Sequence, residues 1–173
     1  MRALPILAAA VLSSSPAFGA LAVGKKAPNF TTQAVIAGKP FAFTLSDALK
    51  KGPVVLYFFP KAFTQGCTVE AHQFSEATED FAKAGATVIG VSADNLSTLT
   101  RFSIEECRNK FAVAVATPGM IKGYDAALPL VKISNRTSYV IGKNGQIAYS
   151  YSAMSATGHV ANTLAAVRQL KAN

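Results

Sequence analysis

Cys67 is the residue whose type and setting most strongly indicate chemistry. It follows an apolar run at residues 54–59, a proline and a short polar loop, and it precedes a segment whose apolar residues have helical spacing. The cysteine is therefore expected in the first turn of a helix, where backbone N–H groups lack helical partners and carry partial positive charge. Such a position stabilises the thiolate, which is the nucleophilic form of cysteine. The sequence thus predicts a reactive thiol at this position.

Three further residues of the same segment fit this chemistry. Thr64 precedes the cysteine by three residues and can place its hydroxyl beside the sulfur. Pro60 has a restricted φ and no N–H, so it stiffens the loop and can shield the sulfur. Glu70, in the first helical turn, suits the positive end of the helix dipole and is expected to pair with an arginine, which makes it a supporting residue.

The composition indicates one globular domain. The chain has 173 residues, of which 50% are hydrophobic and 15% are charged, which is enough apolar material for a sizeable core. Lysine and arginine outnumber aspartate and glutamate by 17 to 9, but the basic residues are scattered. This pattern favours a solvated basic surface over a nucleic-acid site. No later apolar stretch is long enough to span a membrane, so we expect neither a nucleic-acid nor a membrane partner.

The first 19 residues have the pattern of a signal peptide. Arg2 is followed by an apolar stretch at residues 3–12 and by small residues that end at Ala17 and Gly19. We expect cleavage before Ala20, which would leave residues 20–173 as the mature domain and would make the protein exported, in the periplasm. An N-terminal membrane anchor and a helix of the fold are the alternatives.

The remaining chain alternates strands and helices. Strands are expected at residues 30–36, 40–44, 54–59, 86–92, 111–117, 137–141 and 146–151, and helices at 46–50, with Ser46 as the cap, 64–83, 95–110, 120–125 and 157–171. The continuous apolar run at 54–59 is typical of a strand buried on both faces, and Asn144-Gly145 predicts a tight hairpin. The last helix is expected to be amphipathic, with Leu164, Val167 and Leu170 facing inward. The alternation requires crossovers that place helices on both faces of one sheet. We predict an α/β, thioredoxin-like fold with a central mixed sheet and an N-terminal β-hairpin.

The chemistry-bearing residues also form a motif. Pro60, Thr64 and Cys67 read P-x-x-x-T-x-x-C with Glu70 three residues later, and SNRTSYVIGKNGQI places Arg136 where a strand opens. These residues resemble the active-site motif of peroxiredoxins. The surrounding VVLYFFPKAFTQGCTVEAHQF and VIGVSADN resemble the bacterioferritin-comigratory, PrxQ-type branch of the AhpC/TSA superfamily, and the resemblance continues to the C-terminus.

The resemblance implies a thiol-dependent peroxidase that reduces hydrogen peroxide and organic hydroperoxides to water and alcohols, without a metal or organic cofactor. Cys67 would attack the peroxide and become a sulfenic acid. The guanidinium of Arg136 would hold thiolate and peroxide, and Thr64 would hydrogen-bond the peroxide oxygens. The expected reductant is a thioredoxin-like protein or a small thiol, and the expected assembly is a monomer or homodimer.

The second thiol departs from the pattern that is common in this branch. Many members carry a resolving cysteine five residues after the first, where this chain has His72. Some members place it in the next helix, so the resemblance implies that Cys107 resolves Cys67 through an intramolecular disulfide. An inert buried cysteine is the alternative. His72 and His159 are assigned no chemistry.

A rival function on the same fold is a thiol–disulfide oxidoreductase, or a redox-binding module without peroxidase activity. An oxidoreductase of this fold needs a C-x-x-C motif, and Glu70 stands where the second cysteine would be. A binding module leaves the combination of Thr64, Cys67 and Arg136 without an explanation. Peroxidase chemistry is therefore the preferred reading of the sequence.

Overall fold

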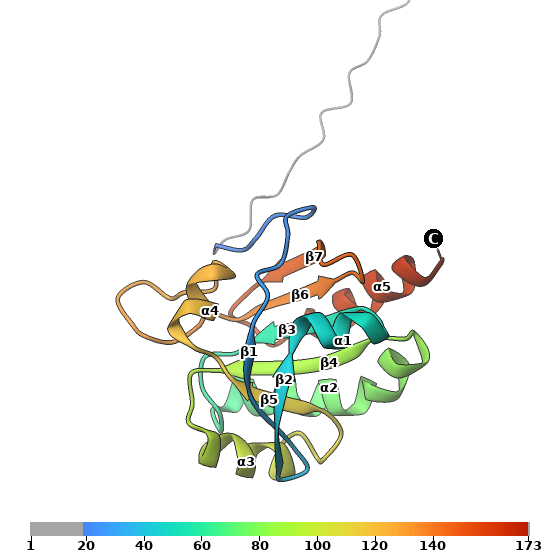
Figure 1. The fold of residues 1–173 in the computed structure, drawn as a ribbon. Helices are drawn as coiled ribbons and strands as arrows, with labels where there is room; N and C mark the ends of the chain where they lie inside the picture. Colours follow the sequence, from blue (N-terminus) through green and yellow to red (C-terminus); the bar gives the residue numbers. More distant parts are fainter. Residues whose placement is uncertain (1–18, 173) are drawn as a thin grey trace, which may run out of the picture.

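The structure, a computed structural model, describes residues 19–172, which form seven strands and five helices (Figure 1). In chain order the elements are β1 (Thr31–Ile36), β2 (Lys39–Thr44), α1 (Leu45–Lys51), β3 (Val54–Phe58), α2 (Gln65–Lys83), β4 (Thr87–Ser92), α3 (Leu96–Glu105), β5 (Ala112–Val115), α4 (Pro118–Gly123), β6 (Thr137–Ile141), β7 (Ile147–Ser152) and α5 (His159–Ala172). The predicted signal peptide at residues 1–19 lies outside the described residues except for Gly19.

One mixed sheet contains all seven strands, in the order β2-β1-β5-β4-β3-β6-β7. Its centre is parallel, because β4 pairs in parallel with both β3 and β5. On one side, β1 of the antiparallel β1–β2 hairpin pairs antiparallel with β5. On the other side, β6 pairs antiparallel with β3, and β7 pairs antiparallel with β6. The predicted thioredoxin-like plan, with a parallel core and hairpins at its edges, is confirmed.

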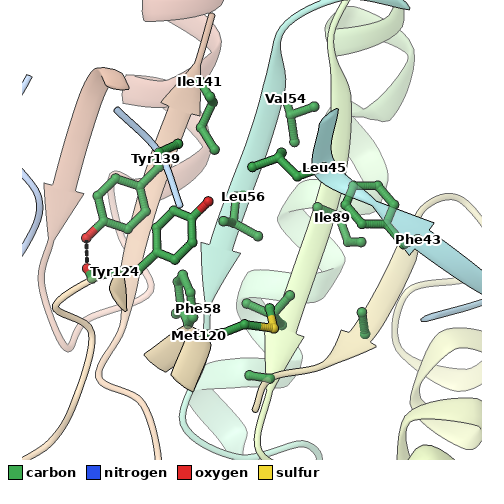
Figure 2. Close-up of a cluster of buried hydrophobic side chains, with 14 of the residues drawn as sticks. Phe43, Leu45, Val54, Leu56, Phe58, Ile89, Met120, Tyr124, Tyr139 and Ile141 are labelled. Carbon is green, nitrogen blue, oxygen red and sulfur yellow. Dashed lines mark hydrogen bonds between the residues drawn. The ribbon is translucent and has the colours of Figure 1, made fainter. Parts of the chain in front are cut away.

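Helices cover both faces of the sheet, as predicted. Every residue of β3 is buried, so alternate side chains of this strand enter two different cores. One core packs Val54, Leu56 and Phe58 against α1 and α4, and Figure 2 shows its aromatic end, where the hydroxyl of Tyr139 donates to the carbonyl of Tyr124.

The other core contains both cysteines. It packs Val55 and Tyr57 of β3 against α2, α3 and α5. Tyr57 stacks on Phe74 of α2 with ring centroids 4.3 Å apart. Burial of a large apolar side chain of this kind stabilises the fold by roughly 1.5–3 kcal/mol. This contact therefore holds α2 against the sheet at a point beyond the first turn of the helix.

Three details of the sequence prediction are wrong. Ser46 does not cap α1, because the helix already includes Leu45 and Thr44 occupies the N-cap position. Leu170, predicted to face inward on the last helix, is 37% exposed. The third predicted helix, at 95–110, ends at Glu105, so Cys107 lies in the turn beyond α3.

The turn that holds Cys107 has a clear physical cause. Arg108 and Asn109 have φ values of 53° and 60°, in the left-handed region, which ends an α-helix. The N–H of Cys107 donates to the carbonyl of Phe102 at 2.9 Å, and that of Asn109 donates to Ser103 at 3.0 Å. These bonds satisfy the carbonyls of Phe102 and Ser103 in the last turn of α3, after which the chain returns to β5.

Between residues 19 and 172, no helix combines the length and the apolar character needed to cross a membrane.

Candidate active site

The first turn of α2 holds the sulfur of Cys67. The helix begins at Gln65 with Thr64 in the N-cap position, and the N–H of Thr68 donates to the carbonyl of Thr64 at 2.9 Å. The N–H groups before Thr68 are therefore those that an α-helix leaves without a helical acceptor. The side chain of Cys67 is 1% exposed. The structure thus places the thiol where the sequence predicted it, at the positive end of the helix.

The loop that leads from β3 into α2 is anchored on both sides of Pro60. Before the proline, the hydroxyl of Ser134 donates to the carbonyl of Phe59 at 2.9 Å in a fully buried bond. After it, the N–H of Ala62 donates to the carboxylate of Asp94 at 2.8 Å. These bonds tie the loop to segments that follow β4 and precede β6, so the sheet fixes the entry into α2. Asp94 and Ser134 were not singled out from the sequence, since neither is near Cys67 in the chain.

The hydroxyl of Thr64 faces the loop backbone. It donates to the carbonyl of Lys61 at 2.9 Å, and no hydrogen bond to Cys67 is found among the described residues. Phe63 has a φ of 63°, which is uncommon for a residue other than glycine, and its ring packs edge-on against Phe102. The backbone of the loop therefore has a defined conformation, and the hydrogen bond of Thr64 helps to maintain it.

Arg136 reaches the sulfur from the start of β6. Its Nη2 donates to Cys67 Sγ at 3.4 Å, its Nη1 donates to Oε2 of Glu70, and its Nε donates to the carbonyl of Met154 at 2.9 Å. The side chain is 4% exposed, so each of these interactions is screened little by water. A Cβ atom at Gly66 would lie 3.0 Å from Nη2, so a larger residue before Cys67 would crowd the guanidinium.

Two acidic groups share this guanidinium. Burial raises the pKa of Glu70 to about 8, and the charge and hydrogen bond of Arg136 oppose that rise. Burial lowers the pKa of Arg136, but the nearby Glu70 and Cys67 more than reverse this effect, so the guanidinium stays charged. The site thus contains a permanent buried cation beside a thiol and a carboxyl.

His159 lies behind Glu70, although no pattern in the sequence assigned it chemistry. The imidazole is fully buried at the start of α5, and its Nδ1 lies 3.6 Å from Oε1 of Glu70 and 2.8 Å from the hydroxyl of Ser138. Burial lowers its pKa to about 4, and the charge of Arg136 contributes to that shift. The signal that could have identified it is a histidine that opens an otherwise amphipathic helix.

Cys107 belongs to the same core as Cys67 but is not bonded to it. Both are free thiols in the described structure, and Cys107 is fully buried. Burial raises the pKa of Cys107 well above its ordinary value, and the charge of Glu106 adds to the rise. In this state Cys107 is a protonated, inaccessible thiol.

The fold therefore brings together most of the residues that the sequence singled out. Arg136 contacts both Cys67 and Glu70, and Pro60 and Thr64 lie in the loop immediately before α2. Such a site can ionise a thiol and stabilise negative charge that develops next to it.

The comparison with protein families gives the decisive observation. The model of the AhpC/TSA family matches residues 23–150, which is well over half of the chain and includes every residue of the site except His159, Met154 and the start of α5. The chain belongs to the AhpC/TSA family.

Similar proteins place this family member among the peroxiredoxins. Peroxiredoxin Q of Oryza sativa subsp. japonica, a chloroplastic protein, is 33% identical over 162 residues, which cover 88% of this chain and 69% of the rice protein. The crystal structure of peroxidoxin BcpB from Mycobacterium tuberculosis is 27% identical with a TM-score of 0.76, and covers 86% of this chain and 97% of that one.

The reduced 2-Cys peroxiredoxin of Plasmodium vivax shares the fold at 24% identity, with a TM-score of 0.77 over 87% of this chain and 96% of that one. The predicted peroxiredoxin resemblance is confirmed, and this AhpC/TSA protein is a thiol-dependent peroxidase. The individual roles of its site residues are proposals, which follow.

Proposed function

We propose that Cys67 is the peroxidatic cysteine of this peroxidase. The observation that carries the proposal is the contact of 3.4 Å between Arg136 Nη2 and Cys67 Sγ in the first turn of α2. The thiolate attacks the terminal oxygen of a hydroperoxide, so that an S–O bond forms while the O–O bond breaks. The departing oxygen takes a proton and leaves as water or an alcohol, and Cys67 becomes a sulfenic acid.

Each neighbouring group has a role in this step. Arg136 donates to the sulfur before the reaction and to the charge that moves toward the peroxide oxygens during it. The hydroxyl of Thr64 turns from the carbonyl of Lys61 toward the bound peroxide, a rotation about one side-chain bond. Pro60 and the anchored loop keep this geometry, which is the condition for electrostatic preorganisation.

Cys107 is proposed as the resolving cysteine. Its thiol would attack the sulfur of the Cys67 sulfenic acid, a disulfide would form and water would leave. Because Cys107 is fully buried in the turn after α3, that turn must open first. A dithiol protein of the thioredoxin type, or a small thiol, would then reduce the disulfide.

The cellular setting is part of the same proposal. Residues 1–19 would direct export and be removed, so the reductant would be a periplasmic thioredoxin-like protein or a small thiol. The expected substrates are hydrogen peroxide and organic hydroperoxides, and the expected assembly is a monomer or homodimer.

Peroxide consumption by the purified protein, with a dithiol reductant, tests the proposal. We expect turnover by the wild type and none by Cys67→Ser, with Cys107→Ala retaining the first, stoichiometric reduction of peroxide. Mass spectrometry of peroxide-treated Cys107→Ala should find one added oxygen, on Cys67. Undiminished consumption by Cys67→Ser would refute the assignment.

A further inference from the structure

Met154 supplies the third acceptor of the Arg136 guanidinium. Nη2 and Nη1 of that group contact Cys67 and Glu70, whereas Nε donates to the carbonyl of Met154 at 2.9 Å. Because the guanidinium is planar and rigid, the bond at Nε restricts the directions in which the two Nη groups can point. The side chain of Arg136 is 4% exposed, so an Nε–H group without an acceptor would be costly. The position of the Met154 carbonyl therefore matters for the contact with the sulfur.

The Met154 carbonyl lies in the segment that joins β7 to α5, outside any strand or helix. The residue before it, Ala153, is tied to Arg136, because its N–H donates to the carbonyl of Arg136 at 3.2 Å. This bond continues the antiparallel pairing of β6 and β7 one step beyond Thr137 and Ser152. It fixes the N–H side of Ala153. The carbonyl side, which leads into Met154, must be held by another group.

His159 holds the carbonyl side of Ala153. Its Nε2 lies 3.0 Å from the carbonyl oxygen of Ala153, and a carbonyl can only accept, so Nε2 carries a hydrogen. In the neutral ring Nδ1 is then an acceptor, and the buried hydroxyl of Ser138 donates to it at 2.8 Å. The imidazole is fully buried and packs edge-on against Tyr151, with ring centroids 4.8 Å apart. Both ring nitrogens have a partner, so the orientation of the ring is fixed.

The two bonds of the imidazole connect the strand next to Arg136 with the segment that accepts from Arg136. Ser138 follows Arg136 by two residues, the spacing that places two side chains on the same face of a strand. Ala153 directly precedes Met154, and the Ala153 carbonyl belongs to the planar peptide group that joins the two residues. A bond to this carbonyl therefore limits the rotation of the chain that would carry the next carbonyl away from Arg136.

We propose that His159 is a positioning residue of the peroxidase site. By holding the Ala153 carbonyl, it keeps the next carbonyl, that of Met154, in place to accept from Arg136. The guanidinium then presents Nη2 to the sulfur of Cys67 in a fixed direction. The inference rests on the proposed roles of Cys67 and Arg136. It adds no covalent or proton-transfer step to the reaction, because the effect of His159 passes through the backbone of residues 153 and 154.

The alternative is that the buried ring only fills the space beside Tyr151, and a matched pair of variants separates the two roles. Glutamine and methionine at position 159 have unbranched side chains of similar length. Only glutamine has an N–H group that can donate to the carbonyl of Ala153 and an oxygen that can accept from Ser138. Loss of packing alone would affect His159→Gln and His159→Met about equally.

The first readout is the exchange of the Arg136 Nε hydrogen with solvent, followed by NMR of the isotope-labelled, reduced protein. We expect His159→Met to speed this exchange roughly five- to tenfold, the effect of a weakened hydrogen bond, and His159→Gln to change it less than about twofold. Equal rates in the wild type and His159→Met, or equal acceleration in both variants, would overturn the proposal. An acceleration shared by the backbone amides of β6 would indicate lost packing and would also overturn it.

The second readout is the rate constant for the first reduction of peroxide. His159→Met should lower it roughly tenfold, because the guanidinium is misplaced, and His159→Gln should lower it less than about threefold. In an Arg136→Lys background no Nε donor remains, so the effect of His159→Met should fall below about a third of its size. An undiminished effect of His159→Met in the lysine background would overturn the proposal.

Thr163→Val is the control for a disturbed start of α5. It removes a buried hydroxyl that donates to the carbonyl of His159 at 2.6 Å but leaves both bonds of the imidazole. We expect it to leave both readouts in place, and changes as large as those of His159→Met would overturn the proposal. The exchange readout needs neither peroxide nor an ionised thiol, so its failure is distinguishable from a failure of the proposed function, which the turnover assay tests.

Discussion

The Nη2 atom of Arg136 lies 3.4 Å from the sulfur of Cys67, although 69 residues separate the two in the chain. The contact exists because β6, which Arg136 precedes, pairs with β3, which leads into α2. A helix terminus alone contributes partial charges, whereas a buried guanidinium adds a full charge with directed donors. The pair is therefore the basis of the predictions that follow.

Arg136→Lys should lower the second-order rate constant for peroxide about 100-fold or more, although it keeps the positive charge. An ammonium group cannot donate to Cys67, Glu70 and Met154 at once in the planar arrangement that the guanidinium provides. Loss of one donor to a developing charge typically costs that much in rate. Stopped-flow competition for hydrogen peroxide measures the constant. Arg168→Lys, which alters an exposed pair with Asp80, is the control and should behave as the wild type.

Cys107→Ala should separate the two halves of the reaction. The rate of the first peroxide reduction should stay within twofold of the wild type, because among the described residues no hydrogen bond or ion pair joins the Cys107 side chain to Cys67, Glu70 or Arg136. Steady-state turnover with a dithiol protein should fall at least tenfold, and a sulfenic-acid reagent should label Cys67. Turnover equal to that of the wild type would show that Cys107 is an inert buried thiol.

Glu106→Gln should speed formation of the intramolecular disulfide after peroxide treatment. Glu106 Oε2 lies 2.7 Å from His72 Nε2 and so ties the turn of Cys107 to α2. A partly exposed hydrogen bond to a carboxylate contributes on the order of 0.5–1 kcal/mol, so weakening it should favour opening of the turn about two- to fivefold. Non-reducing electrophoresis after rapid acid quenching gives the rate. The matched control is Glu105→Gln, whose ion pair with Arg101 lies within α3; an equal acceleration there would contradict the prediction.

His159 should make the protein less stable in mild acid. Its pKa is about 4 in the folded protein, compared with an ordinary value of 6.5. Between these two pH values the imidazole is protonated in the unfolded chain but neutral in the folded protein. This contribution to stability is fully present above pH 6.5 and is lost as the pH falls toward 4, by about 3 kcal/mol in total. Urea unfolding across this range should therefore show a steeper loss for the wild type than for His159→Asn. Parallel curves for the two proteins would contradict a buried neutral histidine.

The sequence alone was sufficient for those features that depend on neighbouring residues. The fully apolar run of β3 and the change to helical spacing around Cys67 predicted the strand, the helix and the position of the thiol between them. The Asn-Gly pair predicted the hairpin of β6 and β7, which the structure confirms. Arg136 was found through the family motif and not through spacing, because its approach to Cys67 depends on which strands are neighbours in the sheet.

The remaining features depend on tertiary contacts. The residues before Phe111 have ordinary helical propensity, and only the left-handed turn at Arg108 and Asn109 shows that α3 ends before Cys107. The burial of His159 against Glu70 requires α5 to pack beside α2 behind the sheet. Neither result follows from local patterns, because each depends on how elements that are far apart in the chain pack together in the common core.

The dependence of the Cys67 nucleophile on Arg136 can be measured directly by the rate of alkylation of Cys67 at neutral pH, in the wild type and in Arg136→Met. We predict that the methionine variant reacts roughly tenfold more slowly, because it lacks the charge and the donor that lie 3.4 Å from the sulfur. Equal alkylation rates in the two folded proteins would contradict a thiolate held by this arginine.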